Sequence, residues 1–245
     1  MRIGEQLRSL RKVNEAEICE RAVIKAIIFD LNGTLLNDYV YNIQAFQMVF
    51  EQFNLSISKE DIGKWMGKPT SYIIEQILLQ NGIKANCTEL AKEKVDIYIT
   101  ITGDKDIFFP ETKEAIHELS KTYKLGLFTG VTRKQVNILG DFLERFELVV
   151  AGEEAIKPKP APDTLLYMVE KMGVRPHECV YVGDMPQDML LARNAGITGI
   201  GIENEVFSKE ALMEAGANKV IRDLKELTKC ASVPIQIVPP KWPVG

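Results

Sequence analysis

Short apolar runs alternate with amphipathic segments along most of the chain. Strands that alternate with helices are typical of a parallel sheet, because parallel neighbours are joined by crossover helices. Right-handed crossovers would place those helices on both faces of the sheet. The pattern therefore predicts an α/β fold. The predicted strands lie at residues 24–29, 125–128, 148–150, 179–182, 197–202 and 220–221.

One interval breaks this alternation. Within residues 39–102, apolar positions recur every three or four residues, as at Ile43, Phe46 and Val49, which predicts helices. The interval leaves the core after the first strand and returns before Pro110. We interpret it as a helical cap that could close over the carboxyl ends of the strands and exclude water. An ordinary pair of crossover helices is the alternative.

The pattern divides the chain into a core, the cap and two terminal segments. The predicted core comprises residues 23–38 and 103–228, and the cap is residues 39–102. Residues 1–22 are an N-terminal extension that could form an amphipathic helix or no fixed structure. Residues 229–245 are a proline-rich tail, expected to be extended if ordered. Neither end carries recognisable chemistry.

The composition favours a protein that acts on small molecules. With 245 residues, 46% of them hydrophobic, the chain can bury a sizeable core. Its net charge of -4 and its mixed acidic and basic residues give no basic surface for nucleic acid. No apolar run approaches the roughly 18 residues that would span a membrane. The sequence thus predicts neither a nucleic-acid nor a membrane partner.

The cysteines and the first residues predict a cytoplasmic protein. The four cysteines are scattered without the short spacing of a zinc site or of a disulfide framework. The first 22 residues contain no apolar core of the kind that signal peptides have. We expect a monomer or a homodimer.

The first predicted strand, 24–29, is followed by a carboxylate and a glycine turn. Because ligands of parallel sheets gather at the carboxyl ends of strands, Asp30 could act as a nucleophile there. The backbone of Gly33 and the hydroxyl of Thr34 could contact an anion. Asn32 stands where such a mechanism would want a second carboxylate to move protons.

Polar residues also follow the second predicted strand and precede a later helix. Thr129 and Gly130 offer a hydroxyl and a backbone N–H that suit a phosphate oxygen, although a strand-ending threonine is more often a helix cap. Lys157 and Lys159 stand before a helix whose first turn we expect to hold the neighbouring prolines. A cation there could neutralise a nucleophile and a transferring phosphoryl group. A solvated turn is the alternative.

Two acids follow the strand at residues 179–182. Mg²⁺ prefers carboxylate oxygens, so Asp184 could bind it directly. Asp188, one helical turn further on, could bind it through water or orient Lys159. Asp188 could alternatively favour the positive end of its own helix.

In this order, the four segments resemble the motifs of the haloacid dehalogenase-like hydrolases, in particular the phosphoglycolate phosphatase-like branch with a helical cap. The resemblance covers residues 23–228 and implies a Rossmann-like core, a bound Mg²⁺ and an aspartyl-phosphate intermediate. It favours Lys159 over Lys157 as the cation, because the spacing to Gly173 then needs no insertion. By resemblance, Asp30 is the nucleophile, Thr129 binds phosphate, and Asp30, Asp184, Asp188 and the backbone carbonyl of Asn32 form the metal site.

Residue 32 departs from the family. Its phosphatases normally have an aspartate there, which protonates the leaving alcohol and later deprotonates the attacking water. The side chain of Asn32 can do neither, and general acid–base catalysis contributes on the order of 100- to 10,000-fold. We therefore expect a slow enzyme that Asn32→Asp would accelerate. An introduced change that traps a bound state and a protein that binds a phosphorylated ligand without turnover are the alternatives.

The remaining candidates concern substrate choice. Gly130 stands where the family often has asparagine, which removes a side-chain contact. Lys68, within the cap, could meet an anionic substrate group or be a solvated lysine. Dehalogenation is less favoured, because Asp184 keeps its character as a metal ligand and residue 32 is not tyrosine-like. The sequence predicts a Mg²⁺-dependent hydrolase of small phosphate monoesters whose cap selects the substrate.

Overall fold

The computed structural model describes residues 23–230 and contains a six-stranded sheet in which every neighbouring pair is parallel. The strand order is β3-β2-β1-β4-β5-β6. Each strand overlaps one of the predicted apolar runs, so the predicted fold class is confirmed. The predicted N-terminal extension and all but the first two residues of the predicted tail lie outside the described residues. The strands are β1 (Ala26–Phe29), β2 (Lys124–Phe128), β3 (Leu148–Val150), β4 (Cys179–Gly183), β5 (Thr198–Ile202) and β6 (Lys219–Ile221).

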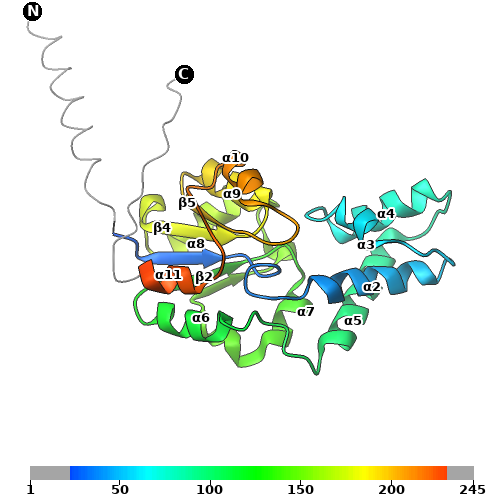
Figure 1. Cartoon of the computed structure of the whole chain (residues 1–245), viewed down its shortest axis with the longest axis horizontal. Helices are drawn as coiled ribbons and strands as arrows, with labels where there is room; N and C mark the ends of the chain where they lie inside the picture. Colours follow the sequence, from blue (N-terminus) through cyan, green and yellow to red (C-terminus); the bar gives the residue numbers. More distant parts are fainter. Residues whose placement is uncertain (1–22, 231–245) are drawn as a thin grey trace, which may run out of the picture.

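Helices cover the sheet and extend beyond one of its edges (Figure 1). None of the helices within residues 23–230 is long and apolar enough to cross a membrane. The α-helices are α2 (Tyr39–Glu51), α3 (Lys59–Gly63), α4 (Thr70–Gln80), α5 (Cys87–Thr102), α6 (Thr112–Ser120), α7 (Arg133–Val136), α8 (Asp163–Lys171), α9 (Pro186–Ala195), α10 (Lys209–Glu214) and α11 (Lys225–Cys230); the 3-10 helices are η1 (Asn137–Arg145), η2 (Gly152–Glu154) and η3 (Pro176–Glu178).

Alternate residues of β1 pack on opposite faces of the sheet. Ile27 and Phe29 join the apolar cluster that includes residues of α6 and α11. Ala26 and Ile28 join the cluster that includes residues of α8 and α9. Because helices cover both faces, a central strand needs apolar side chains on both sides. This is why β1 has a continuous apolar sequence and why it could be recognised.

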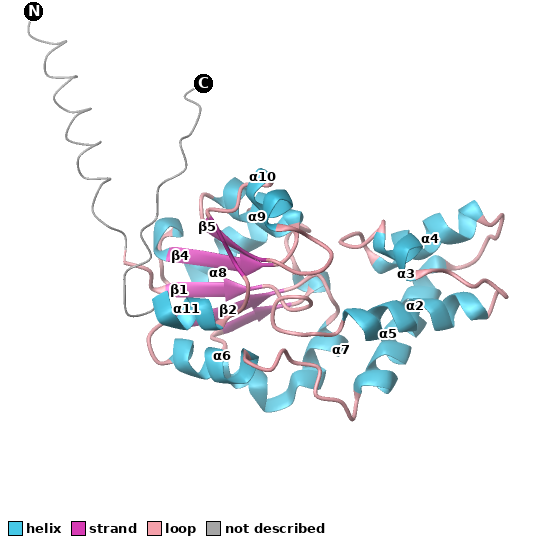
Figure 2. Cartoon of the chain, viewed as in Figure 1, coloured by secondary structure: helices cyan, strands magenta, loops and turns pink. Residues whose placement is uncertain are grey.

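Helices α2 to α5 form a separate layer beyond the carboxyl ends of the strands (Figure 2). They pack around an apolar cluster of their own, which includes Phe46, Phe50, Ile74 and Ile77. The chain enters this helical segment after β1 and returns to the sheet through α6 and β2. The helical segment therefore lies at the edge of the sheet where parallel strands place ligand-binding side chains.

The buried side chain of Glu178 links the amino-terminal ends of the two central strands, β1 and β4. The carboxylate of Glu178, just before β4, lies 2.7 Å from the ammonium of Lys25, just before β1. Arg175 donates to the same carboxylate from its guanidinium and its backbone, each at 2.9 Å. Arg175 and then Lys25 hold the pKa of Glu178 well below its usual range. These contacts fix the starts of β1 and β4 side by side.

We expect Glu178→Gln to lower the free energy of unfolding by about 1–2 kcal/mol near neutral pH. The amide loses charge-assisted hydrogen bonds, although both cationic partners are more than half exposed and therefore screened. Because the folded-state pKa of Glu178 is depressed, its contribution is present above the unfolded value of 4.5 and is lost as the pH falls below it. Urea unfolding from pH 7 down to acid should thus show the difference between parent and variant shrinking. The control is Glu118→Gln, which removes an exposed pair with Lys121; a difference independent of pH would contradict the prediction.

Candidate active site

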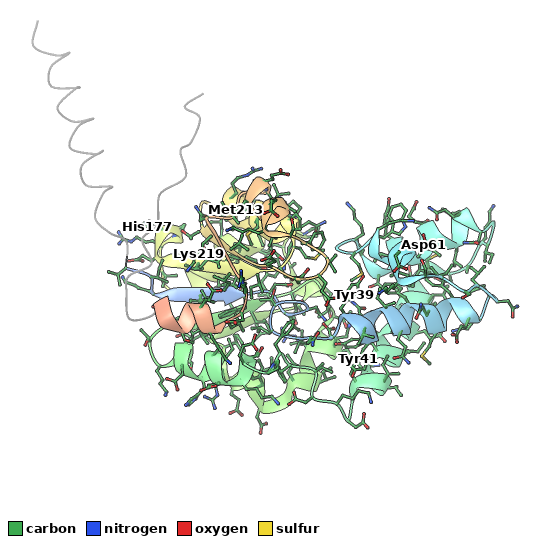
Figure 3. All side chains as sticks on the ribbon, in the orientation of Figure 1. Tyr39, Tyr41, Asp61, His177, Met213 and Lys219 are labelled. Atoms are coloured by element: carbon green, nitrogen blue, oxygen red, sulfur yellow. The ribbon has the colours of Figure 1, made fainter. Side chains whose placement is uncertain are left out.

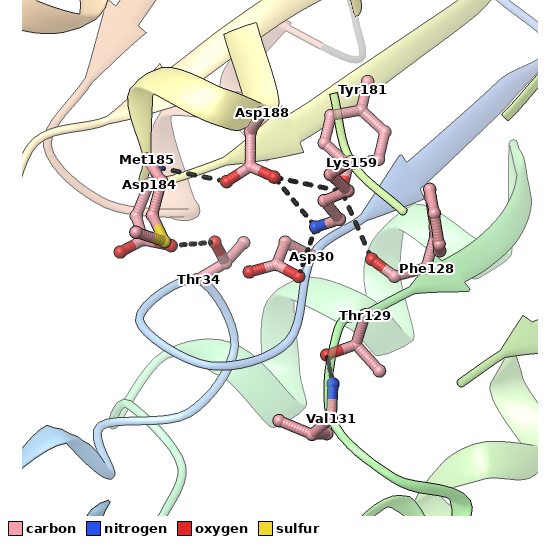
Figure 4. Close-up of polar contacts among 10 residues, drawn as sticks. All are labelled: Asp30, Thr34, Phe128, Thr129, Val131, Lys159, Tyr181, Asp184, Met185 and Asp188. Carbon is pink, nitrogen blue, oxygen red and sulfur yellow. Dashed lines mark hydrogen bonds and ion pairs between the residues drawn. The ribbon is translucent and has the colours of Figure 1, made fainter. Parts of the chain in front are cut away.

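Polar side chains from several elements meet at the carboxyl edge of the sheet (Figure 4). Asp30 follows β1, Thr129 follows β2 and Asp184 follows β4, and β1 lies between the other two strands. Lys159 reaches the same place from the loop before α8, and Asp188 from the first turn of α9. The structure thus brings together the side chains that the sequence placed at separate strand ends.

The ammonium of Lys159 joins two carboxylates. Its Nζ lies 2.7 Å from Oδ1 of Asp30 and 2.8 Å from Oδ1 of Asp188. It also lies 5.2 Å and 5.3 Å from the ring centroids of Phe128 and Tyr181. Burial alone would lower the pKa of Lys159, but the charges of Asp188 and Asp30 raise it well above its usual value. The lysine is therefore a fixed cation beside the predicted nucleophile.

Lys157 lies elsewhere, on the surface. Its side chain is 61% exposed and its ammonium lies 2.6 Å from the carboxylate of Asp163. The prediction that the nearby prolines lie in the first turn of α8 was wrong, because that helix begins at Asp163 and Pro162 occupies the N-cap position. Hydrogen bonds between the hydroxyl of Thr164 and the backbone of Lys157 close the loop before the helix.

Asp184 is buried against the turn that follows β1. Thr34 donates its hydroxyl to Oδ1 at 3.1 Å, and Asn204 donates its amide to Oδ2 at 2.8 Å. A β-carbon at Gly33 would lie 2.3 Å from Oδ2, and the φ of Gly33 is +76°. Only glycine fits a turn with this conformation and this close approach to a carboxylate. Gly33 therefore leaves room for the carboxylate of Asp184 beside the turn, and Thr34 holds it there with a hydrogen bond.

Three carboxylates in this cluster could hold a metal ion. One oxygen each of Asp30, Asp184 and Asp188 lie within 4.8 Å of one another, and all three residues are buried. Burial, together with neighbouring carboxylates, raises the pKa of Asp30 to about 6 and that of Asp184 well above its usual value. A buried excess of negative charge presented by oxygen ligands fits a hard divalent cation such as Mg²⁺. The backbone carbonyl of Asn32 stays a predicted further ligand.

Asp188 makes both contacts that the sequence left as alternatives. Its Oδ1 pairs with Lys159, and its Oδ2 accepts a hydrogen bond of 3.1 Å from the backbone N–H of Met185 at the start of α9. A β-carbon at Gly183 would lie 2.5 Å from atoms of this carboxylate. Close packing against Gly183 restricts the carboxylate of Asp188, which contacts both Lys159 and the amino-terminal end of α9.

Thr129 is buried and does not cap a helix. Its hydroxyl oxygen accepts a hydrogen bond of 3.3 Å from the backbone N–H of Val131, which leaves its own hydrogen free to donate. The cap of α7 is Thr132, whose hydroxyl accepts from the backbone N–H of Gln135. A β-carbon at Gly130 would meet nothing within 4 Å, so space does not require glycine there. The geometry favours the functional interpretation of Thr129.

The helical segment touches the core beside the acidic cluster. A β-carbon at Gly67, in the loop between α3 and α4, would lie 2.8 Å from Cε of Met185 and 3.2 Å from Nε2 of Gln187. These two residues lie in the stretch between Asp184 and Asp188. Lys68 follows Gly67 in this loop, and its side chain is exposed. Its contact with substrate stays a prediction.

Neither histidine joins the cluster. His117 is exposed on α6, where its ring nitrogen Nδ1 lies 2.6 Å from the guanidinium of Arg145. His177 is exposed in η3, and Figure 3 shows it at the opposite end of the molecule from Asp61 of the helical segment. Both histidines therefore lie away from the acidic cluster.

Two residues of the site were not predicted from the sequence. Asn204 holds Asp184 and lies two residues beyond β5, so its position after a strand could have indicated it. Asp38 accepts a hydrogen bond from the side-chain amide of Asn32 and another, at 2.7 Å, from the hydroxyl of Tyr98. Asp38 is the last residue of the predicted core segment before the cap, where no local pattern relates it to residue 32.

An α/β fold with a parallel sheet, an aspartate after the first strand, a largely buried lysine and an acidic cluster is typical of a class of hydrolases. The family model that describes the haloacid dehalogenase-like hydrolases matches residues 27–202. The chain belongs to this family, and the predicted resemblance is confirmed.

Relatives of the chain carry the names of phosphatases. The chain is 29% identical over 201 residues to PpaX of Clostridium perfringens, a protein named as a pyrophosphatase. The match covers 79% of this chain and 90% of that protein. The chain is 26% identical over 221 residues to the phosphoglycolate phosphatase of Photorhabdus laumondii, covering 86% and 94%. A hydrolase of Pseudomonas syringae shares the fold, with a TM-score of 0.72, 24% identity and coverage of 85% and 99%. Family and relatives support a phosphate-ester hydrolase.

We expect Mg²⁺ to stabilise the folded chain through Asp184. An ion at ten times its dissociation constant stabilises the folded state by about 1.4 kcal/mol, which thermal unfolding at increasing Mg²⁺ detects as a rise in Tm. Asp184→Asn should abolish this rise because it removes a buried ligand. The matched control, Asp163→Asn, removes a surface carboxylate and should keep it. An equal Mg²⁺-dependent rise in both variants would show that the ion binds elsewhere.

Proposed function

We propose that this chain hydrolyses small phosphate monoesters with Mg²⁺, through a phosphoryl group carried on Asp30. The observation that carries this proposal is the contact between Lys159 and Asp30, 2.7 Å long at the carboxyl edge of the sheet. The side chain of Asp30 is 10% exposed, so one oxygen can be held by the lysine while the carboxylate still faces the edge. A nucleophile beside a fixed cation suits attack on an anionic phosphoryl group.

The proposed reaction has two displacements at phosphorus. In the first, an oxygen of Asp30 forms a bond to phosphorus as the bond to the ester oxygen breaks. The leaving oxygen takes its proton from solvent, because the amide of Asn32 has none to give. In the second, water attacks phosphorus, the bond to Asp30 breaks, and the proton lost by the water passes to solvent. Phosphate leaves and the carboxylate of Asp30 is restored.

The other side chains stabilise the charge on the transferring group. Lys159 supplies a cation, and the hydroxyl of Thr129 can donate to a phosphoryl oxygen. Asp30, Asp184, Asp188 and the backbone carbonyl of Asn32 would hold Mg²⁺, which when bound supplies further neutralisation of the phosphoryl oxygens.

The choice of ester is assigned to the helical segment, acting as a cap. Its loop at Gly67 touches Met185 and Gln187, and Lys68 adds a cation in the same loop. A relative at 26% identity is a phosphoglycolate phosphatase, so a small ester with a second anionic group is the substrate class that we propose. A cytoplasmic location and a monomeric or homodimeric state stay predictions from the sequence.

A second candidate function is binding of a phosphorylated ligand with little turnover. The observation that favours it is the amide at residue 32, which cannot transfer protons. Binding by Lys159, Thr129 and a metal ion would not need such a group. Turnover by the parent protein that depends on Asp30 decides between the two functions.

We expect Asp30→Asn to reduce Mg²⁺-dependent hydrolysis of p-nitrophenyl phosphate by roughly 1,000-fold or more, because an amide is not a nucleophile for phosphorus. The measurement is kcat/KM for the parent and the variant, with Asp163→Asn as the surface control. Activity of Asp30→Asn equal to that of the parent would show that Asp30 is not the nucleophile. Phosphate binding without hydrolysis by the parent would favour the second function.

The two nearby lysines provide a matched pair of variants. Lys159→Met should lower kcat/KM by roughly 100-fold or more, because it leaves Asp30 and Asp188 buried without their cation. Lys157→Met removes an exposed ion pair and should change kcat/KM by less than about 2-fold. Circular dichroism checks that both variants are folded. Equal losses would contradict the assignment of the cation to Lys159.

A further inference from the structure

A second buried carboxylate lies directly beside the residue that departs from the family pattern. Asp38 is 1% exposed, and its Oδ2 accepts a hydrogen bond from the side-chain amide of Asn32. The hydroxyl of Tyr98, on α5, donates to the same oxygen at 2.7 Å. Asn32 and Asp38 therefore form a matched pair in which one side chain donates and the other accepts.

The pair leaves the carbonyl end of the amide without a partner. Oδ1 of Asn32 and Oδ1 of Asp38 are buried and have no hydrogen-bond partner among the described residues. Because a carboxylate only accepts, Asp38 turns the NH₂ group of Asn32 toward itself and the carbonyl oxygen away. Residue 32 is two positions from Asp30, so its free acceptor belongs to the turn that carries the proposed nucleophile.

Little positive charge compensates the carboxylate of Asp38 among the described residues. Lys94, on α5, is buried and attracts Asp38, but its ammonium donates to the side chain of Asn42 and lies 4.6 Å from the ring centroid of Phe46. Burial lowers the pKa of Lys94 to about 8, against the attraction of Asp38. Burial also raises the pKa of Asp38. One carboxylate is tolerated here at a cost that Lys94 only partly offsets.

An aspartate at residue 32 would change the pair from attraction to repulsion. Two carboxylate oxygens would meet where an N–H group now donates to Asp38, and neither could donate in its charged form. Exchange of the two residues would avoid this. In Asn32→Asp/Asp38→Asn, the NH₂ group at residue 38 takes the position of Oδ2, so one of its hydrogens can donate to the carboxylate at residue 32 and the other to the hydroxyl of Tyr98.

On the basis of the proposed phosphatase function, we propose that Asp38 is a positioning residue. Its carboxylate fixes the amide of Asn32 so that the carbonyl oxygen can accept a hydrogen bond from the attacking water and orient it. The amide and the carboxylate act as a pair, and an acid at residue 32 requires a neutral partner at residue 38.

The first test removes the carboxylate alone. Asp38→Ala, which removes the oxygen that accepts from Asn32, should lower kcat for p-nitrophenyl phosphate by roughly 10-fold or more and leave kcat/KM within about 3-fold, because water attacks only after the alcohol has left. Tyr98→Phe, which keeps both members of the pair, should lower kcat less. The control Asp104→Ala removes a carboxylate whose side chain is 86% exposed and should change neither kcat nor KM.

The second test exchanges the pair. Asn32→Asp alone should lower Tm by several degrees and raise kcat by less than roughly 10-fold, because its new acid faces Asp38. Asn32→Asp/Asp38→Asn should recover the Tm of the parent and raise kcat on the order of 100-fold, since an acid then stands at residue 32 with a donor beside it. The exchange variant keeps a hydrogen bond between residues 32 and 38, so it also tests the proposal if Asp38→Ala does not fold.

Three outcomes would overturn the proposal. The first is Asn32→Asp with the stability and kcat of the exchange variant, which would show that the two residues are independent. The second is Asp38→Ala with the kcat of Asp104→Ala, which would leave Asp38 a structural role only. The third is the absence of Asp30-dependent hydrolysis in every variant. This last result is separate because it refutes the proposed function itself, and the Tm values would then report only the pairing.

Discussion

The structure of the site depends on one largely buried cation, the ammonium of Lys159. Lys159 contacts Asp30 and Asp188, which come from the first strand and from a helix that follows the fourth. Removing carboxylates from water is unfavourable unless a partner compensates them, and an unpaired buried charge costs several kcal/mol. The lysine therefore allows acids to be concentrated at the edge of the sheet. The same contact that makes this cluster tolerable leaves Asp30 oriented and charged for chemistry.

The sheet explains why the cluster could be foreseen. In β1, Phe29 is paired with Leu127 of β2 and with Val182 of β4. The three strands are therefore in register, and the residues that follow them lie at the same edge of the sheet. The continuous apolar strands indicated the sheet, and the rule that ligands gather at its carboxyl edge then related Asp30, Thr129 and Asp184. No side-chain geometry was needed for this step. The distinction between the two lysines came instead from family spacing, and the structure shows which one contacts Asp30.

The partner of Asn32 could not be foreseen in this way. Asp38 is six residues from Asn32, and the two meet because the turn after β1 folds back, with the backbone N–H of Gly33 donating to the carbonyl of Leu36. Tyr98, the second donor, is sixty residues further along the chain. Neither contact follows the period of a helix or a strand. From the sequence alone, Asn32 therefore indicated only the loss of a catalytic acid. The structure shows that its amide donates a hydrogen bond to a buried carboxylate.

This match changes what the absent acid means. Acids at the edge of the sheet are limited by the positive charge available to compensate them, and Lys159 already serves Asp30 and Asp188. A metal ion would offset the charge of Asp184 and its neighbours, whereas the cation that attracts Asp38 among residues 23–230 is the desolvated Lys94. A further carboxylate at residue 32 would lie in contact with the least compensated acid of the group. The identity of residue 32 is thus coupled to residue 38, and in the proposed phosphatase the rate of hydrolysis would be a property of the pair rather than of Asn32 alone.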